Sequence, residues 1–405
     1  MAKTRLAYLQ VGPPTHGICR YGRLLASEGR RRAELEITEE NIDLSGQGGA
    51  ERARLRALAR DLSARADLVH VQVSVWGEGT WGGGWDGPAN LLAFCRASSV
   101  PVVVTLHDAY PLLQPRYRGP FYTALTATVE TGRGLLRPLV RALKRLIRGD
   151  RPGPDVFANL WNYERLSQRA FADVALIGAA KTLVLLEAEK RLFARHGPAK
   201  VESIPHFVED AERPDVVRTQ HTPKTVIIAG FIAPSKGHPL LIEALTLLPD
   251  VRAEFVGGPG LAASSRLNYD FIMDLAREMG VDDRITVTGY LEDALFARRL
   301  AAADLAVCAF EPNKSASGSL ATLIAAGVPM IASNAPAVAE LNALEPDSIL
   351  FFSPYTPAAL AAGIKSALAV PREALTARLQ RLRERLSMAA IYDLHLQAYE
   401  RARRP

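Results

Sequence analysis

Short apolar runs alternate with longer helical patterns along most of the chain. In the first part, the strand-like runs cover 5–11, 67–73 and 100–108, and helical patterns start at about Ile18 and cover 88–99. The runs are continuous stretches of apolar residues and do not alternate with polar ones. Continuous apolar strands separated by helices are typical of a parallel sheet that is covered on both faces.

The same alternation continues and then restarts. We expect it to run on through the apolar stretch 173–179, the helical pattern 181–197 and the stretch 201–207. A polar stretch with two prolines and no periodicity, 208–223, is predicted to be a linker. Six further strand-like runs follow: 224–230, 252–258, 284–289, 304–310, 328–333 and 348–353. The part after about Pro371 is helical and rich in arginine. The pattern therefore predicts two doubly wound α/β domains of similar size.

Composition narrows the class of protein without identifying it. A chain of 405 residues with 48% hydrophobic and 23% charged residues is typical of a globular protein with more than one domain. The net charge of +6 suits an anionic substrate or a membrane surface and is no nucleic-acid signature. The three cysteines lie far apart, which argues against a disulfide framework or a zinc knuckle. With no apolar run long enough for a signal peptide or a spanning helix, we expect a cytoplasmic protein.

One segment of the second half has the pattern of an anion cradle. Residues 311–333 begin with small polar residues around a glycine, continue as a helix, break at 327–329 and end in a strand. The N–H groups at the start of a helix favour an anion. In parallel sheets, ligands lie beyond the carboxyl ends of the strands. We therefore expect the functional residues in the loops that follow the strands.

Eight segments in order along the chain carry motifs that can be compared with known families. The segments of the first half are THGICRYGRLLA (15–26), DLVHVQ (67–72), VVVTLHDAYP (102–111) and IPHFVE (204–209). Those of the second half are GFIAPSKG (230–237), FVGGPG (255–260), 285–310 and 317–333. Each segment by itself is a weak match, but together and in this order they resemble one enzyme family, the retaining GT-B fold glycosyltransferases of the family 4 type.

The resemblance implies a fold and an activity. The fold would be two Rossmann-like domains with an interdomain cleft: an acceptor-side domain over 1–210, a nucleotide-sugar domain over 224–385, and a C-terminal helix, 386–405, that returns to the first domain. The activity would be hexosyl transfer from a nucleotide diphosphate sugar, with retention at the anomeric carbon. No compact Asp-x-Asp motif or histidine cluster is present. We therefore expect no metal and no cofactor besides the donor substrate.

Two residues are candidates for catalysis. Lys236 matches the lysine that binds the donor diphosphate in the family, where a cation offsets the charge of the leaving group. His107 ends a buried strand and matches the histidine that approaches the donor sugar. The family usually has an arginine at the position of Phe231, so a second cation is missing there.

The other candidates are expected to bind the donor. The run from Ser317 to Leu320 would aim backbone N–H groups at the phosphates, although a serine here could also be a plain helix cap. Tyr290 would lie against the base. The full predicted set is Gly12, Gly17, Gly230, Gly257, Gly289, Tyr290, Ser317, Gly318, Ser319, Leu320, Thr322 and Lys314.

Two family glutamates are replaced in the cradle segment. Lys314 stands where the family has the glutamate that reaches the donor sugar, and Thr322 stands where the second one holds the ribose. Lys314 either pairs with the carboxylate of an acidic donor sugar or points to solvent. These losses motivate the alternative that the protein is a degenerate, non-catalytic GT-B binding partner. Retention of Lys236 and His107 argues against it.

The acceptor side carries a basic amphipathic pattern. Residues 133–151 place leucines on one helical face and arginines on the other, which suits either an anionic membrane at its inner face or packing on the first domain. The acceptor would be a glycan, a lipid-linked sugar or a small molecule, and no nucleic acid is expected. Trp76, Trp81 and Trp85 stand in a glycine-rich loop where aromatic rings would stack on acceptor sugars.

Overall fold

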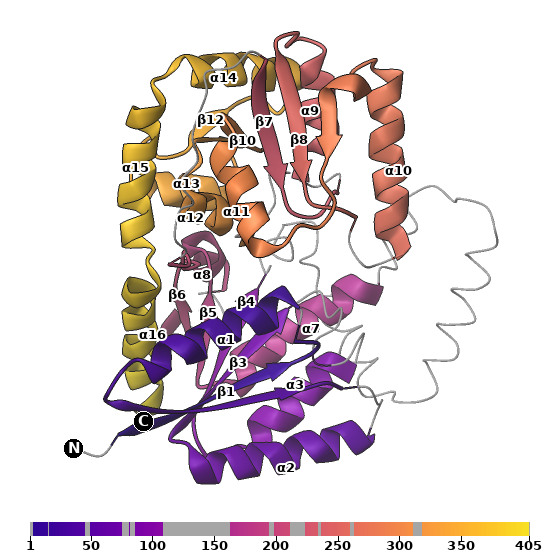
Figure 1. Ribbon diagram of the computed structural model, residues 1–405. Coiled ribbons are helices and arrows are strands. Elements are labelled where there is room, and N and C mark those ends of the chain that lie inside the picture. Colours follow the sequence, from indigo (N-terminus) through magenta and orange to yellow (C-terminus); the bar gives the residue numbers. More distant parts are fainter. Residues whose placement is uncertain are drawn as a thin grey trace, which may run out of the picture. The chain divides into compact units, whose positions relative to one another are not determined.

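The computed structural model describes residues 3–14, 16–44, 49–74, 81, 86–107, 163–193, 198–210, 223–233, 236–259, 263–310 and 318–404. The chain divides into two compact units. The first is Met1–Ile204 together with Leu394–Pro405, and the second is Pro205–Asp393. Each unit is built around one parallel sheet (Figure 1).

The sheet of the first unit has six parallel strands in the order β2-β1-β3-β4-β5-β6. The strands are β1 (Thr4–Val11), β2 (Leu35–Ile42), β3 (Leu68–Ser74), β4 (Val102–His107), β5 (Lys181–Val184) and β6 (Val201–Ser203). Strand order reverses beside β1, because β2 lies on one side of it and β3 on the other. The carboxyl ends of these strands therefore form the edge where a ligand is expected.

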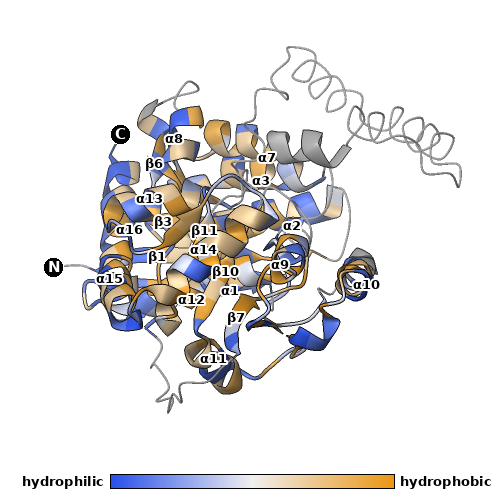
Figure 2. Ribbon diagram, turned by 90° about the horizontal axis from the view of Figure 1, so that it is seen from above, coloured by the Kyte–Doolittle hydropathy of each residue, from blue (hydrophilic) through white to orange (hydrophobic). Residues whose placement is uncertain are grey.

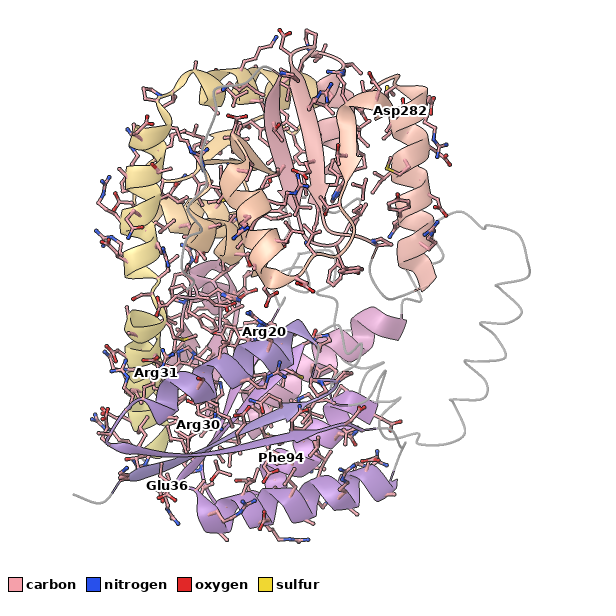
Figure 3. The ribbon with its side chains drawn as sticks, viewed as in Figure 1. Arg20, Arg30, Arg31, Glu36, Phe94 and Asp282 are labelled. Carbon is pink, nitrogen blue, oxygen red and sulfur yellow. The ribbon has the colours of Figure 1, made fainter. Side chains whose placement is uncertain are left out.

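The two faces of this sheet differ in character. The helices are α1 (Gly17–Arg30), α2 (Gly49–Arg65), α3 (Asp86–Ala97), α7 (Tyr163–Gly178) and α8 (Glu187–Phe193). Alternate residues of β1, β3 and β4 pack with α2, α3 and α7 in one apolar core that includes the buried Phe94 of α3, labelled in Figure 3. Helix α1 lies on the opposite face (Figure 1), which carries polar side chains described below.

Two elements of the first unit differ from the expectation. Strand β2 was not predicted, because its sequence LEITEENI has polar residues throughout and its residues are mostly half-exposed. The apolar stretch 173–179 was expected to continue the alternation as a strand, but it forms the last turns of α7, and the strand that follows is β5. A short apolar run does not distinguish a buried strand from one face of a helix.

The sheet of the second unit also has six parallel strands, in the order β12-β11-β10-β7-β8-β9. They are β7 (Lys224–Ala229), β8 (Val251–Val256), β9 (Ile285–Val287), β10 (Leu305–Cys308), β11 (Met330–Ser333) and β12 (Leu350–Phe352). Read from β9, this is the strand order of a doubly wound nucleotide-binding sheet, with its switch point between β7 and β10. All six strands were predicted from the sequence, and the prediction of two doubly wound domains is confirmed.

Helices cover both faces of the second sheet. They are α9 (His238–Leu245), α10 (Ala263–Glu278), α11 (Asp293–Ala302), α12 (Gly318–Ala326), α13 (Pro336–Leu344), α14 (Pro357–Ala369) and α15 (Arg372–Arg385). The apolar core joins β7, β8 and β10 to α9, α10 and α14. In Figure 2 the outer helix α10 carries blue hydrophilic stretches, as expected for an element with one face in solvent.

The last helix, α16 (Met388–Arg403), belongs to the first unit from Leu394 onward. At the start of the second unit, the Val208 N–H donates to the Leu386 carbonyl at 2.7 Å. Residues 211–222 of the predicted linker lie outside the described residues, and so does the whole amphipathic segment 133–151. Of the helices that the structure describes, none is long and apolar enough to cross a membrane.

Candidate functional site

Lys236 and Ser319 meet at the switch point of the second sheet. Lys236 follows β7, and Ser319 lies in the first turn of α12, the helix that follows β10. The Lys236 Nζ donates to the Ser319 Oγ at 2.8 Å and lies 3.5 Å from the Ala229 carbonyl oxygen at the end of β7. Lys236 is half-buried. A cation and a helix N-terminus thus share one position at the carboxyl edge of the sheet, an arrangement that favours an anion.

Glycines allow this close approach. A Cβ on Gly230, which has φ +99°, would lie 2.5 Å from the Lys236 Nζ and 3.0 Å from the Ser319 Oγ. Gly237, directly after the lysine, has φ +85°, and a Cβ there would lie 2.2 Å from the Ala309 carbonyl oxygen. Only glycine satisfies both the backbone conformation and the lack of space. The glycines after β7 therefore hold Lys236 against the end of the sheet.

Gly257 lies at the same carboxyl edge of the second sheet, and its replacement tests how much this close packing matters for stability. Its φ is +145°, and a Cβ would lie 2.3 Å from the Gly230 carbonyl oxygen. We expect Gly257→Ala to destabilise the second unit by about 2 kcal/mol or more, because backbone strain and a backbone clash add. Gly280→Ala is the matched control, since Gly280 also has positive φ (+64°) but nothing within 4 Å. Urea unfolding followed by far-UV circular dichroism compares them, and equal losses for the two variants would contradict this account.

Two aromatic rings line the neighbouring loops. Tyr290 is 59% exposed, its ring lies against Gly258, and its hydroxyl donates to the Pro259 carbonyl. The Phe231 ring, 51% exposed, meets the Tyr290 ring at 6.2 Å with nearly perpendicular planes. Gly289 has φ +68° and open space around its Cα. The loop therefore presents an exposed aromatic surface suited to a planar base, and it includes Tyr290, the residue predicted to lie against the base.

The helix α12 supplies the remaining donor candidates. Gly318 is exposed at its first position, and Leu320 is buried in the core. The Thr322 hydroxyl donates to the Gly318 carbonyl at 2.9 Å, which ties this hydroxyl to its own helix. Ser317 and Lys314 lie outside the described residues, so their predicted roles stay predictions.

Burial keeps two titratable side chains beside Lys236 neutral, His238 and Cys308. The His238 ring is buried with its Nδ1 2.9 Å from the Ala233 carbonyl oxygen, to which it donates. Burial, together with the Lys236 charge, lowers the pKa of His238 to about 4. Burial raises the pKa of the Cys308 thiol, at the end of β10, to about 12. Near neutral pH neither of these two side chains is therefore charged.

In the first unit, the predicted glycines lie around the start of α1. The Gly12 N–H donates to the Ile42 carbonyl at 2.8 Å, and the Gly12 φ of 137° turns the chain out of β1. Gly17 is the exposed first residue of α1. His16 is the N-cap, and its Nδ1 accepts from the Ile18 N–H at 3.3 Å. Because that nitrogen carries a lone pair, the proton of the neutral ring is on Nε2.

His107 is the last residue of β4 and is 6% exposed. Its Nε2 lies 2.9 Å from the Gln72 Oε1, and its ring meets the Tyr21 ring edge-on at 4.9 Å. Since an amide oxygen only accepts, the His107 Nε2 carries the proton of this bond. The position of the ring is therefore fixed by a side chain of the neighbouring strand.

The same hydrogen-bond chain continues beneath the edge of the sheet. The Gln72 Nε2 lies 3.1 Å from the His70 Nε2, and the His70 Nδ1 lies 2.7 Å from the Tyr399 hydroxyl of α16. The amide nitrogen donates, so His70 Nε2 accepts and Nδ1 donates. Burial lowers the pKa of His70 far below its usual value, which keeps the ring neutral. Tyr399 lies 3.1 Å from the Tyr8 hydroxyl of β1.

Of this polar face, the sequence analysis identified His107 alone. The residues occupy alternate positions of three adjacent strands, with pairs separated by one residue. They are Tyr8 and Gln10 on β1, His70 and Gln72 on β3, and Thr105 and His107 on β4. The recurring spacing was a usable signal, but polar residues at alternate positions of a strand are usually read as solvent-facing.

Trp81 requires a correction. It was expected to offer its ring to acceptor sugars, but the side chain is fully buried, packs against Phe94, and donates from Nε1 to the Gln72 carbonyl at 2.9 Å. Its own carbonyl accepts from the Asn90 amide. Burial of the indole with its N–H satisfied makes Trp81 a core residue. Trp76 and Trp85 lie outside the described residues.

The part of the chain that the structure describes contains no group of three or more His, Cys, Asp or Glu side chains arranged to hold a metal ion. Among the described residues, the site of the second unit contains Lys236, the first turn of α12 and an exposed aromatic loop.

The two doubly wound sheets can be compared with the folds of known proteins. The fold is that of GT-B glycosyltransferases: the crystal structure of Anabaena HepE in complex with UDP has a TM-score of 0.65 at 14% identity, covering 98% of this chain and 99% of that chain. A glycosyltransferase from Rickettsia africae (TM-score 0.66, 13% identity) covers 99% of both chains. Sucrose-phosphate synthase from Thermosynechococcus elongatus (TM-score 0.65, 16% identity) covers 98% of both.

The second unit carries the family assignment. Residues 223–369 match the family model of Glycosyl transferases group 1. The match confirms the resemblance and the enzyme class predicted from the sequence, a glycosyltransferase. No curated protein sequence matches the chain.

Proposed function

We propose that the protein is a retaining, metal-independent glycosyltransferase that moves a sugar from a nucleotide diphosphate sugar to a glycan, glycolipid or metabolite acceptor. The observation that carries the proposal is the meeting of the Lys236 Nζ and the first turn of α12, 2.8 Å from Lys236 to Ser319, at the switch point of the second sheet. When the bond to the sugar breaks, negative charge grows on the diphosphate. A lysine and the N-terminus of a helix, both aimed at that charge, would stabilise the transition state.

The same arrangement supports metal independence. Many transferases of phosphorylated substrates use a divalent cation to neutralise the leaving phosphate. Here the protein itself would supply the positive charge through Lys236. HepE, which shares the fold, was solved with UDP and with UDP-glucose. A uridine diphosphate sugar is therefore the first donor to test, with the base placed on the exposed Tyr290 and Phe231 surface.

The experiment is a donor screen with the purified full-length chain. UDP-, GDP-, ADP- and dTDP-sugars, including uronic acids, are added with and without EDTA, and thermal stability and sugar release are followed. We expect one donor to stabilise the protein and to be slowly hydrolysed in EDTA. NMR of the released sugar at early times reports its anomeric configuration. Loss of turnover in EDTA would contradict metal independence, and release of the inverted anomer would contradict retention.

Two observations favour a second candidate, a non-catalytic GT-B protein that binds a nucleotide. Phe231 occupies the position where the resemblance expects an arginine, and its ring centroid lies 5.9 Å from the Lys236 Nζ. The Thr322 hydroxyl, at the position of a family glutamate, is bonded to its own helix. Stabilisation by a donor with no hydrolysis and no transfer to any acceptor would support this candidate.

A further inference from the structure

We propose that the groove between α2 and α3 of the first unit binds the phosphate group of a phosphorylated small molecule of about the size of a sugar phosphate. Four arginines line a cavity of about 350 Å³ there: Arg52, Arg56, Arg60 and Arg96. The other lining residues are Ala89, Leu92, Ala93 and Ala97. The inference does not depend on the proposed function, because binding is measured whether or not sugar is transferred.

The arginines converge from two helices. Arg52, Arg56 and Arg60 are four residues apart along α2, so they lie on one face of that helix. Arg96 comes from the last turn of α3, and Asp86 begins that helix. The Asp86 carboxylate forms an ion pair with Arg52 at 3.2 Å. Four arginines thus line the groove, and one of them, Arg52, is paired with a carboxylate.

On the opposite side of α2, the arginines are paired with carboxylates, in contrast to those of the groove. Arg54 is paired with Glu51 at 3.7 Å, and Arg65 is paired with Asp61 and Glu40. Neither Arg56 nor Arg60 forms an ion pair with any residue in the described part of the chain, and the same holds there for Arg96. Like charges four residues apart destabilise a helix. An anion in the groove would remove that repulsion.

The chemistry of the groove selects a phosphate monoester. Guanidinium groups donate two parallel hydrogen bonds to phosphate oxygens, and arginine remains charged at any working pH. A phosphate monoester carries nearly two negative charges at pH 7, so it balances several arginines better than a carboxylate does. The alanines and Leu92 give the groove an apolar floor. Its volume lies at the small end of ligand sites, which fits one sugar ring with its phosphate.

The test measures binding of glucose 6-phosphate to the full-length chain by isothermal titration calorimetry and thermal shift. UDP is present in excess throughout, so that the Lys236 site is occupied. We expect saturable binding that weakens as salt is raised, and at least a tenfold weaker affinity in the Arg56→Gln/Arg60→Gln double variant. Both side chains are exposed, so the fold should not change, and the ligand-free double variant should unfold at the same or a slightly higher temperature.

The matched control is Arg54→Gln, which removes an arginine from the same helix but from its paired side. It should bind glucose 6-phosphate like the unchanged protein, as should Lys236→Met. Glucose without phosphate should not bind in any variant. Absence of saturable binding, or equal loss in Arg54→Gln and in the double variant, would overturn the proposal.

A second arm distinguishes a soluble phosphate from a lipid head group. Sedimentation with phosphatidylcholine vesicles, with and without phosphatidic acid, is compared for the unchanged protein and the double variant. Glucose 6-phosphate should bind and should compete with any vesicle binding that needs Arg56 and Arg60. Vesicle binding that depends on these arginines while glucose 6-phosphate fails to bind would overturn the soluble source and assign the groove to a lipid.

Discussion

Replacing Lys236 by methionine is expected to lower kcat/KM for sugar transfer by about 10²- to 10³-fold, the loss typical of removing one preorganised group that stabilises charge in a transition state. Methionine keeps much of the length and flexibility of the lysine stem and removes only its charge and its donors. The effect should fall mainly on kcat, since the charge on the leaving diphosphate is greatest in the transition state.

The control for this experiment is Lys224→Met. Lys224 lies at the start of β7, at the other end of the same strand, and is paired with Asp304 at 3.4 Å. The Lys224→Met substitution removes the same charge from the same unit and should leave kcat/KM nearly unchanged. Ser319→Ala, which removes the hydroxyl that accepts from Lys236, should have a smaller effect than Lys236→Met. If Lys236→Met kept full transfer activity, the diphosphate would be bound elsewhere.

Acidification from pH 7 toward pH 4 is expected to destabilise both units through two buried histidines. In the unfolded chain a histidine has a pKa near 6.5. Burial holds the pKa of His238 at about 4 and lowers that of His70 far below its usual value. Below about pH 6.5 the unfolded chain binds protons that the native state does not, so stability falls as the pH falls. The loss should reach about 3 kcal/mol for His238 alone.

The two contributions can be measured separately. All four tryptophans lie between residues 76 and 161, in the first unit, so tryptophan fluorescence reports its unfolding and circular dichroism reports both units. His238→Gln should reduce the acid loss of the second unit and leave the fluorescence transition unchanged. Urea unfolding at pH 7 and pH 4 gives the loss of stability of each unit. A second unit whose stability is as sensitive to acid in His238→Gln as in the unchanged chain would contradict the assignment.

The strands of the second sheet could be predicted because each is a continuous apolar run between helical patterns. Strand β2 could not, because an edge strand has one pairing partner and its polar residues face solvent along most of its length. The end of α7 was misassigned since its apolar residues are buried on more than one side. Periodicity carries no information where a helix is apolar nearly all round.

The candidate site likewise contains residues that could be predicted from the sequence and residues that could not. Lys236 and its glycines could be identified because the motif is local, and their positive φ angles give a physical reason for glycine at Gly230 and Gly257. The burial of Trp81 and the polar chain that joins His107 to Tyr399 could not, although His107 itself was identified. Their environment depends on contacts such as the one between His70 and Tyr399, which are 329 residues apart in the sequence. No local pattern records such a contact.

That last contact has a consequence for how the protein is made. The polar face of the first sheet is completed by Tyr399 from residues 394–405, which are synthesised after the other residues of both units. Ile204 and Leu394 are separated by 190 positions (394 − 204), so a ribosome needs roughly 10 to 40 s to travel between them. During that time the first unit has its six strands but lacks the partner of its buried histidine. Messages that end before codon 394 would therefore damage the half of the protein that was translated first.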